Sequence, residues 1–144
     1  MTRDEKFMVE ALRAAHIALE KNEVPIGAIV VLGERVIAKA YNLTETLNDP
    51  TAHAEMQAIT MATNYLGGKY LDKCELYVTV EPCPMCAAAL NWSQLKRLVY
   101  GASDPKRGYS LFSPSLLHPK TEVSRGILEA ECSILMSDFF KKKR

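Results

Sequence analysis

The sequence predicts an α/β fold, one sheet with helices on both of its faces, and three observations support this. Apolar runs of strand length occupy residues 26–32 and 76–80. Longer segments with helical periodicity alternate with such runs, and a strand hairpin precedes this alternation. The 144 residues are 48% hydrophobic, which is enough to fill a sizeable core. We therefore expect residues 1–144 to form a single domain.

The first elements are a helix and a hairpin. Residues 4–21 have helical periodicity, and one face carries the apolar residues Phe7, Ala11, Ala14, Ala15, Ala18 and Leu19. The apolar run 26–32 is followed by Gly33 and Glu34, which favour a tight turn. Residues 36–41 alternate enough to be the second strand of this hairpin.

The later elements alternate between helix and strand. The segment 54–66 is apolar on most of its circumference and stops at Gly67, as a helix packed on a sheet would. Further strands are expected at residues 76–80, 98–101 and 122–124. Further helices are expected at residues 82–94 and 128–142. A loop containing proline and serine joins the strand at 98–101 to the short strand at 122–124.

Two short motifs carry the chemistry. One is Thr51-Ala52-His53-Ala54-Glu55, and the other is Pro82-Cys83-Pro84-Met85-Cys86. His53, Cys83 and Cys86 offer one imidazole and two thiolates, which leaves one position of a tetrahedral zinc ion open. A structural zinc site would normally have a fourth protein ligand. The pair of motifs therefore predicts a catalytic zinc site.

Local geometry supports these ligands. Pro84 fits the first turn of a helix, so Cys83 and Cys86 project to one side of the helix start, at the positive end of its dipole. A second helix is expected to begin near Pro50 and Thr51, with His53 in its opening turn. Spacing alone leaves open whether Glu55 faces the metal, because residues two apart diverge around a helix.

The chemistry of this set is hydrolytic. Zinc lowers the pKa of a water molecule, which then supplies a nucleophile at neutral pH. Glu55 is the expected catalytic residue, because a nearby carboxylate can move the proton from water to a ring nitrogen and then to a leaving amine. These steps describe the deamination of an amidine-like carbon.

Each motif taken alone has a more ordinary interpretation. A histidine near an apolar helix is more often a core or surface residue, and Cys-x-x-Cys also fits redox sites and zinc ribbons. The sequence has no second Cys-x-x-Cys to complete a ribbon. The other two cysteines, Cys74 and Cys132, lie in apolar segments and are expected to be buried thiols. The conjunction of the motifs therefore favours the catalytic site.

The chain resembles the bacterial tRNA adenosine deaminases of the cytidine deaminase superfamily. The resemblance is carried by residues 22–28, 49–55, 77–86, 101–104, 126–128 and 137–140, which include the two motifs. It implies a three-layer α/β/α sandwich around a mixed five-stranded sheet, with one zinc per subunit in a homodimer. It also implies conversion of adenosine to inosine at the wobble position of a tRNA, an arginine tRNA among the candidates, by contact with the anticodon loop.

The resemblance also implies substrate contacts. Those expected to bind the nucleotide are Asn42, Val24, Ala54, Pro82 and Asp104. Those expected to contact RNA are Lys106, Arg107, Phe139 and Phe140, and the basic tail 141–144 is a further candidate. Ordinary interpretations stay open, because an asparagine can end a strand, Asp-Pro is a turn signal, and basic residues complement a helix C-terminus. Residues 106–115 depart from the glycine- and alanine-rich loop of the family.

Composition narrows the remaining choices. The net charge of +1 requires any phosphate-binding surface to be a local patch. No apolar stretch has the length of a membrane span or signal core, and four cysteines fit a reducing compartment, so we expect a cytoplasmic protein. Two other functions stay open: deamination of a free base or nucleoside such as guanine or cytosine, and a noncatalytic module stabilised by zinc.

Overall fold

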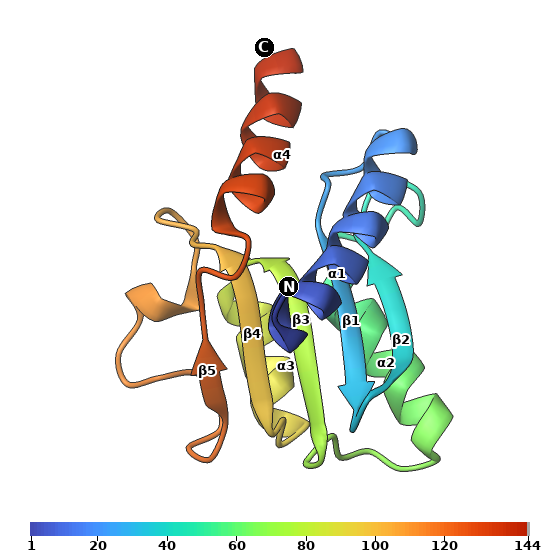
Figure 1. Ribbon diagram of the computed structural model, residues 1–144, viewed down its shortest axis with the longest axis vertical. Helices are drawn as coiled ribbons and strands as arrows, with labels where there is room; N and C mark the ends of the chain where they lie inside the picture. The colour runs from blue at the N-terminus through green and yellow to red at the C-terminus, as the bar shows by residue number, and fades with distance from the viewer. Residues whose placement is uncertain (144) are drawn as a thin grey trace.

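A five-stranded sheet with the strand order β2-β1-β3-β4-β5 forms the middle layer of the protein (Figure 1). The computed structural model describes residues 1–143; Arg144, the end of the basic tail, lies outside them. The strands are β1 (Gly27–Leu32), β2 (Arg35–Tyr41), β3 (Cys74–Val80), β4 (Arg97–Ala102) and β5 (Glu122–Ser124). β1 runs antiparallel to β2 and β3, whereas β3, β4 and β5 run parallel. The expected mixed sheet is confirmed.

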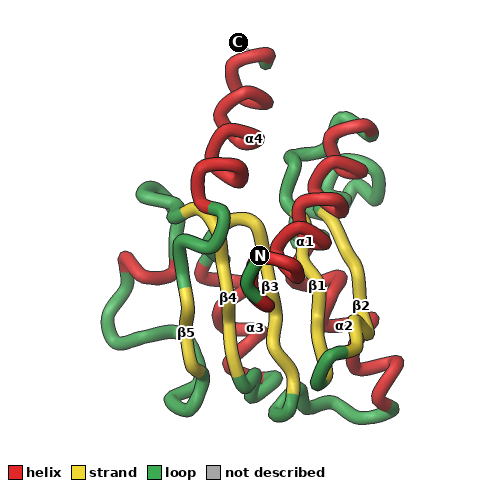
Figure 2. The backbone as a smooth tube through the Cα atoms, viewed as in Figure 1, coloured by secondary structure: helices red, strands yellow, loops and turns green. Residues whose placement is uncertain are grey.

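Helices cover both faces of this sheet, as Figures 1 and 2 show. α1 (Arg3–Glu20) and α4 (Glu129–Lys142) lie on one face. α2 (Ala54–Leu66) and α3 (Pro84–Trp92) lie on the other. The three-layer sandwich expected from the family resemblance is therefore present. None of the helices in the described part of the chain is long and apolar enough to cross a membrane.

The alternation of side chains along the strands fills two cores. In β1, Ala28 and Val30 pack with the core under α2 and α3, whereas Ile29 and Val31 pack with the core under α1. All four of these side chains are fully buried. This double burial explains why the strand forms a continuous apolar run in the sequence, because both of its faces are covered.

The sheet topology brings four chain segments to one edge. β3 and β4 are parallel and both end there, β2 ends there with Tyr41 paired to Gly27, and β1 begins there. The residues that follow β2, β3 and β4, and those that precede β1, therefore surround a common space. Sites in α/β sheets form at such carboxyl ends, and the two predicted motifs lie at this edge.

The structure shifts some expected boundaries. α3 begins at Pro84 and ends at Trp92, a shorter span than the expected 82–94, because Cys83 is the residue that precedes the helix. α2 begins at Ala54 and not near Pro50, since His53 has an extended backbone. A short 3₁₀ helix at Tyr109–Leu111 lies in the loop after β4, where no element was expected.

Candidate metal centre and active-site cavity

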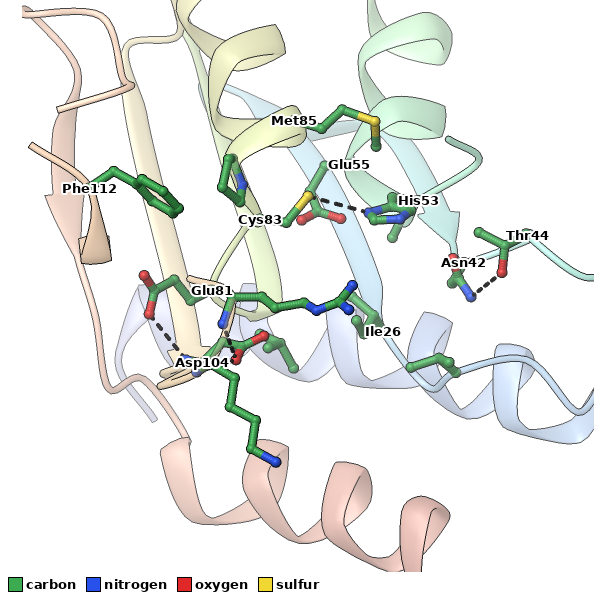
Figure 3. A pocket seen from close by; sticks show the side chains of 16 residues that line it. Ile26, Asn42, Thr44, His53, Glu55, Glu81, Cys83, Met85, Asp104 and Phe112 are labelled. Carbon is green, nitrogen blue, oxygen red and sulfur yellow. Dashed lines mark hydrogen bonds between the residues drawn. The ribbon is translucent and has the colours of Figure 1, made fainter. Parts of the chain in front are cut away.

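His53, Cys83 and Cys86 meet at the edge where the strands end. His53 is the residue that caps the start of α2, and Cys83 caps the start of α3. The Nδ1 atom of His53 lies 3.6 Å from the Sγ atom of Cys83 and 3.6 Å from that of Cys86. Figure 3 shows His53 and Cys83 pointing toward one another from the two helices. The sequence-predicted ligands are thus brought together.

The spacing of these three atoms fits a tetrahedral metal ion. Zinc–sulfur distances of about 2.3 Å and zinc–nitrogen distances of about 2.0–2.1 Å place a nitrogen and a sulfur ligand about 3.5–3.6 Å apart at a tetrahedral angle. The observed nitrogen–sulfur separations match this value. Among residues 1–143 no fourth histidine, cysteine or carboxylate belongs to the group. The donor set therefore suits a metal with one position left for a reactant.

The two thiols of the group differ in acidity. A hydrogen bond from Cys86 and a further one from His53 lower the pKa of Cys83 to about 4. The same bond to Cys83, together with burial, raises the pKa of Cys86. Cys83 is therefore a thiolate at neutral pH, and a metal ion bound between the two sulfurs would displace the proton of Cys86.

Glu55 lies beside this group with only 4% of its surface exposed. Figure 3 shows its carboxylate near the side chains of His53 and Cys83. Because His53 has extended dihedral angles, φ −68° and ψ 157°, the two residues do not follow each other on a regular helix and can face the same space. Burial raises the pKa of Glu55 to about 7, a value suited to a group that accepts and returns protons at neutral pH.

A cavity of about 520 Å³ opens over the metal group and Glu55. Six of the predicted substrate and RNA contacts line it: Val24, Asn42, Ala54, Asp104, Lys106 and Arg107. The sequence had not singled out Ile26, Thr44 and Met85 as lining residues. Phe112 also lines the cavity, whereas Tyr109 is buried and packs edge-to-face against Tyr100.

Asn42 and Asp104 each have a structural role as well as a place in the cavity wall. The Nδ2 atom of Asn42 donates to Glu23 Oε1 at 3.4 Å and to Thr44 Oγ1 at 3.3 Å. Because its donor is engaged in this way, its carbonyl oxygen is the group left for a ligand. Asp104 Oδ1 accepts from the backbone of Lys106 and Arg107, so the turn indicated by Asp-Pro is also present.

Three predicted contacts lie elsewhere. Pro82 is buried and does not line the cavity; its carbonyl accepts a hydrogen bond from Tyr109 N, and its neighbours Glu81 and Cys83 form the wall. Phe139 and Phe140 lie on α4 and form an edge-to-face pair outside the cavity. Phe139 is 8% exposed and Phe140 46% exposed, so only Phe140 faces outward from α4.

Two buried carboxylates near the cavity were missed in the sequence. Glu23 accepts hydrogen bonds from the backbone of Glu45 and Thr46, and Glu81 accepts them from the backbone of Asp104 and Ser110. The sequence did hold a signal for both. Glu23 lies two residues before Pro25, just ahead of a buried strand, and Glu81 lies directly before Pro82, just after another buried strand. A charged residue in such a place is seldom buried without partners.

The fold and this arrangement of residues define a deaminase of the cytidine deaminase-like class. A family model described as MafB19-like deaminase matches residues 2–144. The tRNA-specific adenosine deaminase of Bacillus subtilis is 46% identical to this chain, and the match covers 100% of this chain and 92% of that protein. That of Agrobacterium fabrum is 47% identical over 96% of this chain and 94% of that protein.

A solved structure gives the same result. It comes from studies of A-to-I editing by tRNA deaminases at the wobble position of transfer RNA, and it is 46% identical with a TM-score of 0.85. The match covers 90% of this chain and 98% of the other. The chain belongs to the family of tRNA-specific adenosine deaminases, and it is a hydrolytic enzyme.

Proposed function

We propose that the protein hydrolyses adenosine to inosine at the wobble position of a tRNA, with an arginine tRNA as substrate and one zinc ion per subunit. The main support for this proposal is the buried Glu55 beside a three-ligand metal group, in a cavity that Lys106 and Arg107 also line. The names of the relatives support tRNA as the substrate class.

The residues of the cavity have separate roles in the reaction. When bound by His53, Cys83 and Cys86, zinc supplies a nucleophile derived from water at neutral pH. Glu55 takes one proton of that water and delivers it to the ring nitrogen, then moves the second proton, from the hydroxyl group formed at the ring carbon, to the departing amino group, so that water and adenosine become inosine and ammonia. Its burial excludes bulk water and keeps these protons in the site.

The residues that line the cavity would recognise the nucleoside. The carbonyl oxygen of Asn42 accepts a hydrogen bond from the nucleoside, while Val24 and Ala54 offer apolar contact to the flipped base. Lys106 and Arg107 offer positive charge to the phosphates on either side of it. An anticodon loop suits such a cavity because its bases are already unpaired and can be extruded.

The proposal is tested with the zinc-loaded protein and an arginine tRNA that carries a wobble adenosine. Nuclease digestion and mass spectrometry locate any inosine, and the same tRNA with a wobble guanosine is the matched control. Free bases and nucleosides, including guanine and cytosine, are incubated in parallel. Inosine at the wobble position alone supports the proposal. Ammonia from a small substrate, with no inosine in the tRNA, would reassign the protein to base deamination.

We also propose that the protein is a cytoplasmic homodimer. Trp92 at the end of α3 is 84% exposed, so it is not a core residue of this chain. It borders a surface hollow together with Tyr70 and Leu116, an apolar group that a second copy would cover. Sedimentation of a Trp92→Glu variant tests this, since loss of the dimer is expected.

A cytoplasmic location agrees with a tRNA substrate and with the four free thiols among the described residues, which persist in a reducing compartment.

A further inference from the structure

The loop after β4 is wound around one buried carboxylate, that of Glu81. Glu81 follows the last residue of β3 and is 4% exposed. Its Oε1 accepts from Asp104 N at 3.1 Å, and its Oε2 accepts from Ser110 N at 3.0 Å and Ser110 Oγ at 2.7 Å. Figure 3 shows Glu81 and Asp104 side by side at the cavity wall. Both ends of the segment 104–110 are therefore held by one side chain.

Asp104, which Glu81 holds, in turn accepts hydrogen bonds from the backbone of the next residues in the loop. Its Oδ1 accepts from Lys106 N and from Arg107 N, each at 3.0 Å, and its backbone carbonyl accepts from Gly108 N at 3.0 Å. Glu81 therefore holds Asp104, and Asp104 holds the backbone of the two basic residues. The position of Lys106 and Arg107 depends on Glu81 through this chain of hydrogen bonds.

Gly108 shows how closely the loop approaches the carboxylate. A Cβ atom at this position would overlap Glu81 Oε2 and would lie 2.6 Å from the carbonyl oxygen of Asp104. Only glycine allows the backbone to pass here without moving the loop outward. This close approach is independent of the hydrogen bonds and indicates the same centre, the side chain of Glu81.

The loop presents its charge to the cavity and not to its own carboxylates. Lys106 and Arg107 line the cavity, and neither forms an ion pair within the part of the chain that the structure describes. The oxygens of Glu81 are occupied by N–H and O–H donors, which offset its negative charge locally. The side chains of Lys106 and Arg107 thus stay available for a polyanion.

We propose that Glu81 is a positioning residue that fixes the cationic wall for the phosphates flanking the reacting nucleoside. The proposal rests on the proposed function, because it takes RNA as the ligand. Glu81 acts here through the loop and not on the reacting atoms. Its loss is therefore expected to weaken RNA binding and to reduce the ionic component of that binding, while the metal group and Glu55 stay in place.

The test replaces Glu81 by glutamine. A Glu81→Gln side chain keeps one acceptor oxygen but turns an NH₂ group toward Asp104 N–H or Ser110 N–H, which opposes donor to donor. Fluorescence anisotropy with an anticodon stem-loop RNA, repeated over a salt series, gives Kd and its salt slope. The expected Kd is about tenfold higher, and the slope falls by about 0.7 for each single-strand phosphate that the protein no longer neutralises. Zinc content and circular dichroism confirm that the variant is folded.

A matched control comes from a second buried carboxylate, that of Glu23. Glu23 is also buried and also accepts from two backbone N–H groups, but the turn that it holds, residues 42–49, contains no lysine or arginine. Glu23→Gln is therefore expected to keep the wild-type salt slope. If it lowers the slope as much as Glu81→Gln does, the effect is a general structural one and the proposal is wrong.

A double variant, Lys106→Ala with Arg107→Ala, completes the test. It should show the same reduced slope, and adding Glu81→Gln should cause no further loss, because the two changes act on one interaction. Additive losses, or wild-type Kd and slope in Glu81→Gln, would overturn the positioning role. If the wild-type protein binds the RNA with these dependences yet forms no inosine, the proposed function fails and the role of Glu81 stands.

Discussion

Individual residues of the site owe their positions to the two helix starts. His53 and Cys83 both precede a helix with extended backbone angles, and Cys86 lies one turn further along α3. Both helix N-termini direct partial positive charge at the metal group, which stabilises the thiolate form of cysteine. The motif residues were predictable because ligand identity and spacing are local properties of the sequence. That Glu55 faces the group was not, because it depends on where α2 begins.

At the residue scale we predict that Glu55→Ala retains the metal but loses activity. Deamination should fall by at least about a hundredfold, the usual contribution of a positioned proton-transfer group. Inosine formation and zinc content are measured on the same preparation. Glu129→Ala is the control, because Glu129 also lies in the first turn of a helix, on the remote α4. A zinc-loaded Glu55→Ala variant with wild-type turnover would favour the noncatalytic, zinc-stabilised module.

Helices and strands could be predicted from local sequence patterns, whereas the structure of the loop after β4 could not. The expected helix at 4–21 and strand at 26–32 lie within one residue of α1 and β1 at each end, because apolar periodicity and turn residues act locally. The 3₁₀ helix at 109–111 was not expected. Its position depends on Glu81, which lies 29 residues from Ser110 in the sequence, and no local pattern reports such a contact.

At the scale of elements, the packing of α1 on β1 leads to a prediction about Gly27. A Cβ atom here would overlap the carbonyl oxygen of Ala11 and lie 2.9 Å from the Cβ of Ala14, both in α1. Gly27→Ala should therefore push α1 away from the sheet and lower the free energy of unfolding by about 1–3 kcal/mol. Urea denaturation measures this value.

Gly68→Ala is the control for this change. No atom lies within 4 Å of the added Cβ at position 68, and its φ is not in the left-handed region. We expect a shift within about 1 kcal/mol, in the stabilising direction, because alanine restricts the unfolded chain. Equal stability of the two variants would contradict the close packing between α1 and β1.

The whole molecule is tied together by an ionic network at the start of α1. Arg97 of β4 pairs with Asp4 of α1 at 2.6 Å and with Glu75 of β3 at 2.7 Å. Tyr77 donates to Asp4 at 2.7 Å, and Arg3 reaches Glu75 at 2.8 Å. The network joins a helix to two strands distant in the sequence, so its partners could not be paired from the sequence alone.

This network predicts a dependence of stability on pH. The hydrogen bond from Arg97 lowers the pKa of Asp4 below its ordinary value of 3.8. The stabilisation is therefore full above that value and is lost as the pH falls through the lower pKa of the folded state. Arg97→Met should lower the free energy of unfolding by about 2 kcal/mol at neutral pH, and its difference from wild type should narrow below about pH 4.

The comparison is made by urea denaturation over a pH series. Arg13→Met is the control, because Arg13 pairs with Glu10 on the surface with 70% of its side chain exposed. Such a pair contributes less than about 1 kcal/mol, so little change is expected. An Arg97→Met deficit that stays constant down to strongly acidic pH would show that the ion pair with Asp4 does not carry the effect.

We propose that the protein, with a zinc ion held by His53, Cys83 and Cys86, deaminates the wobble adenosine of a tRNA. Titration of zinc into metal-free protein, with inosine at that position as the readout, tests it most directly. We expect inosine formation to rise in proportion to bound zinc and to stop rising at one zinc per chain. Full activity in the metal-free protein, or no inosine when every chain holds zinc, would contradict it.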